Sequence, residues 1–403
     1  MAVNKCEQGN VPVMELTKQQ QSLLNGEMGK AARQSMEILC ALGKIYGARG
    51  MIPVTSSQIS GVSYKTIGGA GLEYLQDLAK KGARVAIPSF LNPAGMDSEQ
   101  WKEVGVPEAF AKKQLEVLSA YRSMGITMSC TCTPYLVGMR PKQGEHVAWS
   151  ESSAVCFANS VLGARTNREG GPSALAAAIC GCTPNYGLHL DENRIAKLLV
   201  KVEAKLSGMS DYGALGAYVG EEALGKVPAF TGVTGATEDR LKSLGASMAA
   251  WGSAAIYFVK GVTPEWNVED GAEEIAFGAR ELRQMREKMS GDGKPDIIAI
   301  GCPHASLAEI EEVAARVKGK KVACQLWVCT ARKTKLDADK EGLTAIIEEA
   351  CGHVVADTCM VVCPLEEMGF KTTACNSGKA AKYLSSACRQ KVVYGDVEDI
   401  ICK

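Results

Sequence analysis

The sequence predicts an α/β fold built from parallel-sheet βα units. Short apolar segments recur along the chain, and each leads into a loop rich in Gly, Ser, Thr or Asn and then into a segment of helical periodicity. In such units ligands bind at the carboxyl ends of the strands. A chain of 403 residues is also long for a single hydrophobic core, so we expect two or three domains.

The first expected domain, residues 1–130, is an α/β region that starts with a long helix. Apolar spacing near 3.6 residues and terminal glycines predict that helix, and two further strand–loop–helix units follow it. The expected elements in order are helix 15–48, strand 51–54, helix 71–81, strand 84–88, helix 108–124 and strand 126–128. The last strand leads into a loop that contains Cys130 and Cys132.

The second expected domain, residues 131–290, is a central lobe. Apolar residues predict buried helices over 150–162 and from 174 onward, and residues 193–260 alternate helical and Gly-rich pieces. Residues 268–290 are predicted to form a charged amphipathic helix. The Gly- and Pro-containing segment 290–295 is a plausible domain boundary.

The third expected domain, residues 291–403, has the clearest α/β pattern. We expect strands at 296–301, 321–328, 353–356 and 371–374, and helices at 307–317, 343–350 and from 379 to 387. Each strand ends at or just before a cysteine, at Cys302, Cys329, Cys359 and Cys375. Because the carboxyl ends of parallel strands share one edge of a sheet, these cysteines are expected along a ligand-binding edge.

Composition excludes several classes of protein. The 45 basic and 45 acidic residues cancel, and no basic run suggests nucleic-acid binding. The most apolar stretch, 244–259, is too short and too rich in Gly and Ser to span a membrane. Residues 1–10 lack the apolar segment of a signal peptide. We therefore expect a soluble, cytoplasmic protein.

Sixteen cysteines stand out in this composition. Without a secretion signal a disulfide framework is a poor explanation, and most are expected to be buried small residues. Cys302 and Cys359 at βα junctions, with a third thiolate from the Cys130/Cys132 loop, would suit an iron–sulfur cluster with one open iron that acts as a Lewis acid. Two alternatives stay open: packing alone, or a zinc site on the Cys130/Cys132 and Cys180/Cys182 pairs, which lack the usual zinc spacing.

Residues 129–189 concentrate thiols, hydroxyls, amides, guanidiniums and carboxylates, which favours an active site over a buried core. Within this stretch Arg165 and Arg168 could clamp an anion, and Glu169 could transfer a proton. The alternative is a solvated turn at the end of a helix. Among the histidines, His304 beside Cys302 is the one expected at a site. Motifs of serine hydrolases, P-loop NTPases and dinucleotide-binding proteins do not occur.

At these residues the sequence resembles the large subunit of the aconitase X family, within the aconitase superfamily of iron–sulfur hydro-lyases. The resemblance covers essentially the whole chain from Met14. It rests on segments 60–64, 92–95, 132–135, 149–155, 159–171, 186–189, 261–265, 301–304 and 376–379.

The resemblance implies a dehydratase in which Cys132, Cys302 and Cys359 hold the cluster, as [4Fe–4S] in preference to [2Fe–2S]. Members dehydrate mevalonate 5-phosphate or cis-3-hydroxy-L-proline. The sequence of residues 167–171 resembles that of the two-subunit members, including archaeal ones. This favours mevalonate 5-phosphate as substrate and an anhydromevalonate phosphate as product. At position 58 this chain has Gln, where many relatives carry a differently polar residue.

The resemblance also implies roles for individual residues. Catalytic groups are expected among Ser152, Ser153, Glu169 and His304. Residues expected to contact the hydroxy-acid substrate are Gly61, Ser63, Tyr64, Asn92, Asn159, Ser160, Arg165, Asn167, Arg168, Asn376, Ser377 and Lys379.

The family further uses a small swivelling domain. Since this chain ends at Lys403 without one, we expect a separate small subunit that closes over the cluster in a heterodimer or higher assembly. The competing class of function is a non-catalytic iron–sulfur or zinc-binding scaffold or sensor subunit.

Overall fold

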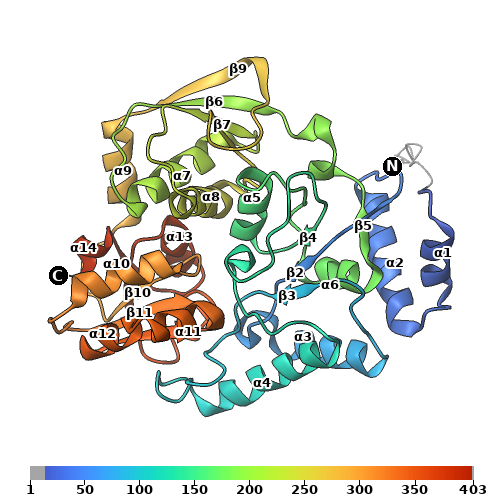
Figure 1. Ribbon diagram of the computed structural model, residues 1–403, viewed down its shortest axis with the longest axis horizontal. Helices are drawn as coiled ribbons and strands as arrows, with labels where there is room; N and C mark the ends of the chain where they lie inside the picture. The colour runs from blue at the N-terminus through green and yellow to red at the C-terminus, as the bar shows by residue number, and fades with distance from the viewer. Residues whose placement is uncertain (1–13, 402–403) are drawn as a thin grey trace, which may run out of the picture.

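The structure, a computed structural model, describes residues 14–401, in which four β-sheets are covered by helices (Figure 1). The predicted α/β class is confirmed. Residues 1–10, which were predicted not to form a signal peptide, lie outside the described residues. No helix within residues 14–401 is both long enough and apolar enough to cross a bilayer.

The long helix expected at the start is two helices. Helix α1 spans Lys18–Asn25 and α2 spans Lys30–Ile45. The prediction of one helix was wrong because Gly26 ends α1 at a φ of 83° and Gly29 precedes α2 at 101°, backbone conformations that interrupt helical periodicity.

The first region contains a parallel three-stranded sheet in the order β3-β2-β4. Its strands are β2 (Ser57–Ile59), β3 (Ser89–Leu91) and β4 (Ala148–Trp149). Its helices are α3 (Tyr64–Lys80), α4 (Glu108–Ser123), α5 (Ser152–Ser160) and α6 (Gly171–Cys180). The β2 strand was not predicted, since its buried Ser57 and Gln58 interrupt any apolar pattern.

Three strand predictions in this region need correction. The segment expected at 51–54 is β1 (Met51–Pro53), which pairs antiparallel with β5 (Cys182–Pro184) in a separate two-stranded sheet. The strand expected at 84–88 begins only at Ser89. Residues 126–128 form no strand and contribute a single bridge between Phe90 and Thr127.

A second parallel sheet has the order β8-β7-β6-β9. It comprises β6 (Ala196–Val202), β7 (Pro228–Thr231), β8 (Phe258–Val259) and β9 (Val268–Phe277), with helices α7 (Met209–Ala223), α8 (Glu238–Gly252) and α9 (Ala279–Met289). The helix expected over 268–290 was wrong in its first half. The charges there belong to an exposed edge strand, where Glu274 pairs with Lys201 of β6 at 2.6 Å.

The third sheet is parallel and five-stranded, in the order β12-β11-β10-β13-β14. Its strands are β10 (Ile297–Ile300), β11 (Gln325–Thr330), β12 (Gly352–Ala356), β13 (Thr372–Cys375) and β14 (Lys391–Tyr394). Its helices are α10 (Leu307–Val317), α11 (Arg332–Lys340), α12 (Leu343–Glu349), α13 (Gly378–Ser386) and α14 (Val397–Ile401). Four strands were predicted and are confirmed; β14 was not.

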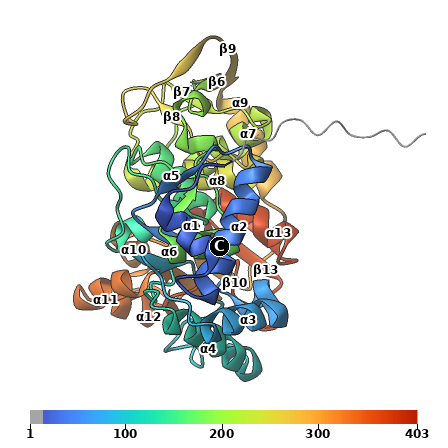
Figure 2. The same cartoon turned by 90° about the vertical axis from the view of Figure 1, so that its right-hand side faces the viewer.

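The three regions pack against one another. In both ribbon views the β6–β9 sheet lies at one end, and α3 and α4 lie at the other (Figures 1 and 2). One buried cluster draws Phe110 from the first region, Ala214 and Met285 from the second, and Cys302 and Cys359 from the third. The shared cluster brings the loops of the first and third sheets together.

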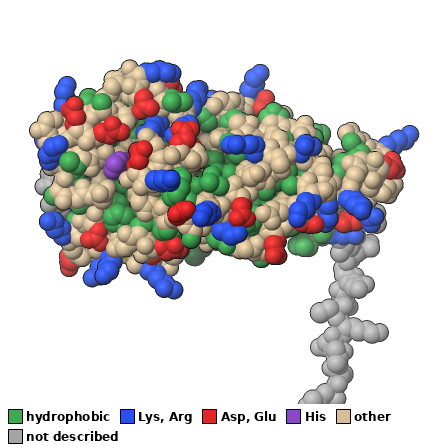
Figure 3. Space-filling model, turned by 90° about the horizontal axis from the view of Figure 1, so that it is seen from below, with side chains coloured by type: hydrophobic (Ala, Val, Ile, Leu, Met, Phe, Trp, Pro, Cys, Tyr) green, Lys and Arg blue, Asp and Glu red, His purple; other side chains and the backbone are tan. Residues whose placement is uncertain are grey.

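Charges of both signs are interspersed on the face seen in Figure 3.

Candidate active site

One cavity of about 220 Å³ lies where the carboxyl ends of two parallel sheets face each other. Loops after β2, β3 and β4 approach it from the first region, and loops after β10 and β12, with helix α13, approach from the third. Its lining residues are Ser60, Asn92, Pro93, Cys132, Ser150, Glu151, Ser152, Arg168, Cys302, Cys359, Val361, Val362, Lys379 and Tyr383. Strand ends from distant parts of the sequence thus form one site.

The three predicted ligand cysteines all line this cavity. Cys132 is 4% exposed, and Cys302 and Cys359 are each 6% exposed. The contact between the Cys302 and Cys359 thiols lowers the pKa of Cys359 and raises that of Cys302. Burial raises the pKa of Cys132 to about 12. Three buried thiols therefore converge on one cavity, and one of them, Cys359, has a lowered pKa.

This donor set fits an iron–sulfur cluster better than a single ion. A single zinc ion holds thiolates about 2.3 Å from one point, and no group of three His, Cys, Asp or Glu side chains within residues 14–401 is arranged that way. A cluster spreads its thiolates around several irons. The hydroxyl of Thr358, directly before Cys359, is buried without a partner in the described structure. Neither Cys180 nor Cys182 lines the cavity, so the pairing required for the zinc alternative does not occur there.

A buried ion pair forms one wall of the cavity. Lys379 Nζ contacts the Glu151 carboxylate and lies 3.3 Å from Ser153 Oγ. Glu151 also caps α5 by accepting from Ala154 N–H at 2.8 Å, and it accepts from the Ser152 hydroxyl at 3.2 Å. Burial alone would raise the pKa of Glu151, but Lys379 outweighs it and holds that pKa at about 2. Burial alone would lower the pKa of Lys379, but Glu151 outweighs it together with the nearby thiols and raises that pKa, so both side chains are charged.

Gln58, the position that departs from many relatives, supports the cavity from behind. Its Oε1 accepts from Glu151 N–H at 2.9 Å, and its Nε2 donates to Thr131 O at 3.2 Å and Asn92 Oδ1 at 3.3 Å. The side chain is fully buried and does not line the cavity. It therefore fixes three lining loops relative to one another.

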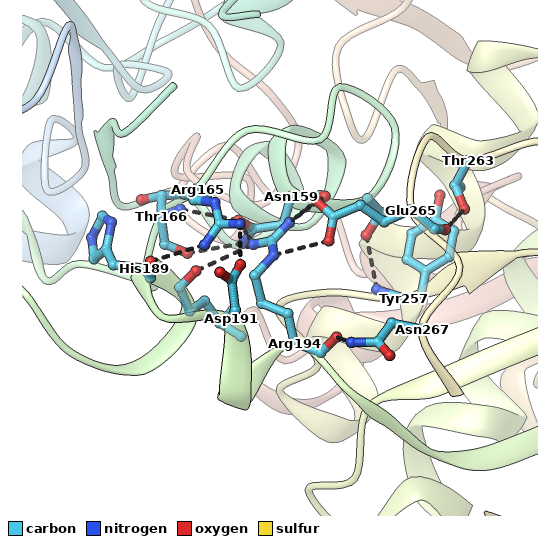
Figure 4. A network of polar contacts seen from close by, with 12 residues as sticks. Asn159, Arg165, Thr166, His189, Asp191, Arg194, Tyr257, Thr263, Glu265 and Asn267 are labelled. Atoms are coloured by element: carbon cyan, nitrogen blue, oxygen red, sulfur yellow. Dashed lines mark hydrogen bonds and ion pairs between the residues drawn. The ribbon is translucent and has the colours of Figure 1, made fainter. Parts of the chain in front are cut away.

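Several predicted substrate residues hold a neighbouring loop instead of lining the cavity (Figure 4). Asn159 donates to Thr166 O and Ala255 O, each at 2.9 Å, and accepts from Arg194 at 3.2 Å. Arg165 pairs with Asp191 and donates to His189 O at 3.1 Å.

Asn167 and Ser160, two further predicted substrate residues, also form hydrogen bonds with backbone groups outside the cavity. Asn167 accepts from Leu188 N–H at 2.8 Å, and Ser160 accepts from Tyr257 N–H at 2.8 Å. Asn159, Arg165 and Asn167 thus hold the segment that leads from α6 into β6. Ser160 holds the segment between α8 and β8.

Three expected catalytic residues also lie outside the lining. Ser153 donates to the Glu151 carboxylate and lies 3.3 Å from Lys379 Nζ. Glu169 accepts from the hydroxyls of Ser173 at 2.5 Å and Thr183 at 2.9 Å, and burial raises its pKa. His304 is fully buried with both ring nitrogens bonded, and burial lowers its pKa to about 4. Its imidazole is therefore neutral near pH 7.

The remaining predicted residues border the site. Ser63 Oγ donates to Val362 O at 2.8 Å, and Tyr64 N–H donates to Gln114 at 2.9 Å. Gly61, at a φ of 80°, lines an adjacent apolar cavity. Asn376 and Ser377 line a small space on the other side of Cys302, and Ser377 caps α13.

Sequence reasoning missed some lining residues, chiefly Ser60, Ser150, Glu151 and Tyr383. Glu151 stood inside a motif used for the resemblance, but Glu is not among the residues preferred at an N-cap, so local pattern did not single it out. Tyr383 lies four residues after Lys379 on α13, a spacing that places both on one face of the helix. Ser60 and Ser150 also stood inside segments used for the resemblance, 60–64 and 149–155, but no local pattern distinguishes them from the other hydroxyl residues there.

Comparison with known proteins covers nearly all of the chain. Models described as the aconitase X first, second and third domains match residues 13–192, 196–287 and 295–403. The division after residues 130 and 290 that the sequence suggested stays a prediction. In a crystal structure of Thermococcus kodakaraensis aconitase X in its holo-form, 99% of the chain aligns with 96% of this one at a TM-score of 0.91 and 48% identity.

Sequence relatives agree with this structural match. The phosphomevalonate dehydratase large subunit of Methanocaldococcus jannaschii is 50% identical over 400 residues, covering 96% of this chain and 99% of that protein. The one from Methanothermobacter thermautotrophicus is 52% identical over 390 residues, covering 96% and 98%. The cis-3-hydroxy-L-proline dehydratase of Pseudomonas aeruginosa is 36% identical, over 90% of this chain and 65% of that protein. The chain belongs to the aconitase X family.

Proposed function

We propose that this chain is the large, catalytic subunit of an iron–sulfur-dependent hydro-lyase that dehydrates mevalonate 5-phosphate to an anhydromevalonate phosphate. The observation that carries the proposal is the convergence of three thiols and a buried ammonium group on one cavity. The substrate choice is supported by near full-length identity of about half to relatives named phosphomevalonate dehydratase large subunit. The second candidate, cis-3-hydroxy-L-proline, is the substrate named for relatives at 36% and 33% identity.

Cys132, Cys302 and Cys359 would hold the cluster, and three ligands favour [4Fe–4S] with one iron open. When bound, the cluster supplies a Lewis acid that assists departure of the substrate hydroxyl. The chain's own residues bind and orient the substrate around this group.

Cationic side chains suit the two acidic groups of mevalonate 5-phosphate. Lys379 is held inside the cavity by Glu151, and Arg168 lines the cavity with an exposed side chain. A guanidinium suits the bidentate geometry of a phosphate or carboxylate. The hydroxyls of Ser60, Ser150 and Ser152 add hydrogen-bonding groups along the same wall.

Proton removal from the carbon beside the leaving hydroxyl needs a base. Glu151 is a carboxylate that lines the cavity, yet at a pKa of about 2 it is a weak base near neutral pH. We therefore assign Glu151, with Ser152 and Ser153, to substrate positioning and assign the base to a partner subunit. Glu169 and His304 do not reach the cavity and are not assigned a catalytic contact.

The partner is a small subunit that covers the cavity in a heterodimer or higher assembly. The relatives at about 50% identity are named large subunits, which implies a small one. The cis-3-hydroxy-L-proline dehydratases are longer single chains, of which this chain covers 65% and 67%. Those proteins thus have additional chain that a separate subunit would provide here.

The test starts from the chain co-expressed with its small subunit and purified anaerobically. Iron and acid-labile sulfide in about equal amounts, with turnover of mevalonate 5-phosphate, support the proposal. Turnover of cis-3-hydroxy-L-proline alone would replace the substrate. A bound cluster with turnover of neither would indicate a scaffold or sensor subunit, and a Cys302→Ser variant that keeps its iron would remove that residue from the ligand set.

A further inference from the structure

His304 contacts all three loops that carry the cavity's cysteines. Its backbone N–H donates to Cys132 Sγ at 3.1 Å. Its Nδ1 lies 3.0 Å from Oγ1 of Thr131, the residue before Cys132, and its Nε2 lies 2.9 Å from O of Thr358, the residue before Cys359. The residue itself follows Cys302 by two positions, so one side chain and its peptide group bridge three loops.

The direction of each hydrogen bond follows from the partners. A carbonyl oxygen only accepts, so Nε2 carries the ring proton and donates to Thr358 O. In a neutral imidazole Nδ1 then accepts from the Thr131 hydroxyl. Thr131 Oγ1 also accepts from Thr133 N–H at 3.1 Å. Both ring nitrogens are thus satisfied inside the protein, and neither is left to face a substrate.

A second buried group anchors the same residue from another domain. Lys242 of α8 is 2% exposed, and its Nζ donates to His304 O at 3.3 Å. The ammonium also pairs with Asp239 at 2.8 Å and with Glu309 at the start of α10. Segments that match the first, second and third family domains therefore all contact His304.

We propose that His304 is a positioning residue that sets the spacing of Cys132, Cys302 and Cys359 before a cluster is inserted, and that Lys242 holds it in place. Loops that are already ordered lose less conformational entropy when they bind a group, so they bind it more tightly. The N–H···S bond to Cys132 acts on the cluster as well, because hydrogen bonds to ligating sulfur tune its electronic properties. The inference rests on the proposed function, since it assumes that these cysteines ligate a cluster.

The sharpest test is a pair of substitutions at Thr131, which is fully buried. Thr131→Val removes the hydroxyl that donates to Nδ1, whereas Thr131→Ser keeps it. His304→Gln removes the ring, and His353→Gln, on β12 and outside the cavity, is the matched histidine control. Each full-length variant is reconstituted anaerobically with iron and sulfide. The measurements are iron content, the rate of iron loss to a chelator, visible circular dichroism of the bound cluster, and the unfolding temperature of the metal-free chain.

We expect Thr131→Val to lose iron about tenfold faster than the wild type, equivalent to about 1.4 kcal/mol. Its visible circular dichroism should change, a readout that a merely structural role would not move. Thr131→Ser and His353→Gln should stay within about twofold of the wild type.

The outcomes separate the two proposals. A wild-type chain that takes up no iron and sulfide overturns the cluster and the positioning role together. A wild type that holds the cluster, with Thr131→Val and His304→Gln retaining it at the wild-type rate and with an unchanged spectrum, overturns the positioning role alone. If His304→Gln does not fold, the Thr131 pair decides.

Discussion

Replacing Lys379 by methionine should destabilise the metal-free chain by about 3–5 kcal/mol, the usual cost of removing one partner from a buried ion pair. Lys379 is 7% exposed, and its partner Glu151 is 6% exposed. Without the ammonium group, Glu151 would keep its contacts with Ser152, Ser153 and Ala154 N–H but would remain a buried anion without a counter-charge. Methionine preserves most of the side-chain volume, so charge and not packing dominates the change.

The pH dependence of this loss follows from the Glu151 carboxyl. In the wild type Lys379 outweighs the effect of burial and holds the pKa of Glu151 at about 2, below the ordinary value of 4.5. The stabilising contribution of Glu151 is therefore present above about pH 4.5 and is lost as the pH falls through 2. In Lys379→Met the ammonium group that opposes the effect of burial is gone, so we expect the pKa of Glu151 to rise. A raised acid pKa means that the folded state binds the extra proton, so the variant should be most stable at low pH and weaken as the pH rises.

The assay is urea unfolding of the metal-free wild type, Lys379→Met, Glu151→Gln and the double variant, at pH 7 and pH 5. The double variant buries no charge and should recover most of the loss. A Lys379→Met chain as stable as the wild type at pH 7, or a double variant no better than the worse single variant, would refute this account of the ion pair.

Three further predictions concern substrate binding, backbone space and acid stability. Arg168→Ala should raise KM for mevalonate 5-phosphate about tenfold or more with a smaller effect on kcat. The control Arg165→Ala, outside the cavity, should leave both constants near the wild-type values. Steady-state kinetics measure both, and equal effects of the two substitutions would contradict the assignment of Arg168 to substrate binding. Gly171→Ala would place Cβ 2.5 Å from Ser60 O and should lower activity by shifting the lining loop, while Gly170→Ala, with its nearest atom at 3.7 Å, should not. Burial raises the pKa of Asp97, but Gln100 N–H and Arg332 outweigh it and lower that pKa below 3.8, so wild-type stability should fall as the pH drops through and below 3.8. Unfolding curves of Asp97→Asn should lack this component, and an unchanged acid profile would contradict it.

Much of the fold could be read from local pattern. In the third region buried strands of four to six residues alternate with amphipathic helices such as α10, which carries a Ser306–Glu309 capping box. The local signals for β10 to β13, α10, α12 and α13 agree with the tertiary structure, so the type and order of these elements were predictable, whereas α11, β14 and α14 were missed. Near the N-terminus the pattern failed at β2, where buried Ser57 and Gln58 make their hydrogen bonds across strands and no apolar run identifies them.

The candidate site residues also fall into two groups, those whose role could be predicted from the sequence and those whose role could not. Cys302, Cys359 and Asn92, which follow strand ends, and Cys132 and Lys379, in loops or helices expected after strands, could be selected from the sequence and do line one cavity. Asn159, Arg165 and Asn167 have the same chemical character, yet their side chains hold the segment around residues 186–194. Figure 4 shows the contacts of Asn159 and Arg165. Local sequence does not distinguish a polar group aimed at a ligand from one that satisfies a buried backbone.

The sequence by itself determined the α/β class, the positions of the cysteines at strand ends and the resemblance to the aconitase X family, because these depend on periodicity and on motifs along the chain. Only the tertiary structure decided that Glu151 and Lys379 form a buried pair and that His304 faces inward to three loops, across separations of 228 residues for the pair and of 173 and 54 residues for the two ring contacts. Those contacts arise when separate sheets pack and exclude water from their polar groups. Burial, and not residue type, then sets each group's charge, partners and role.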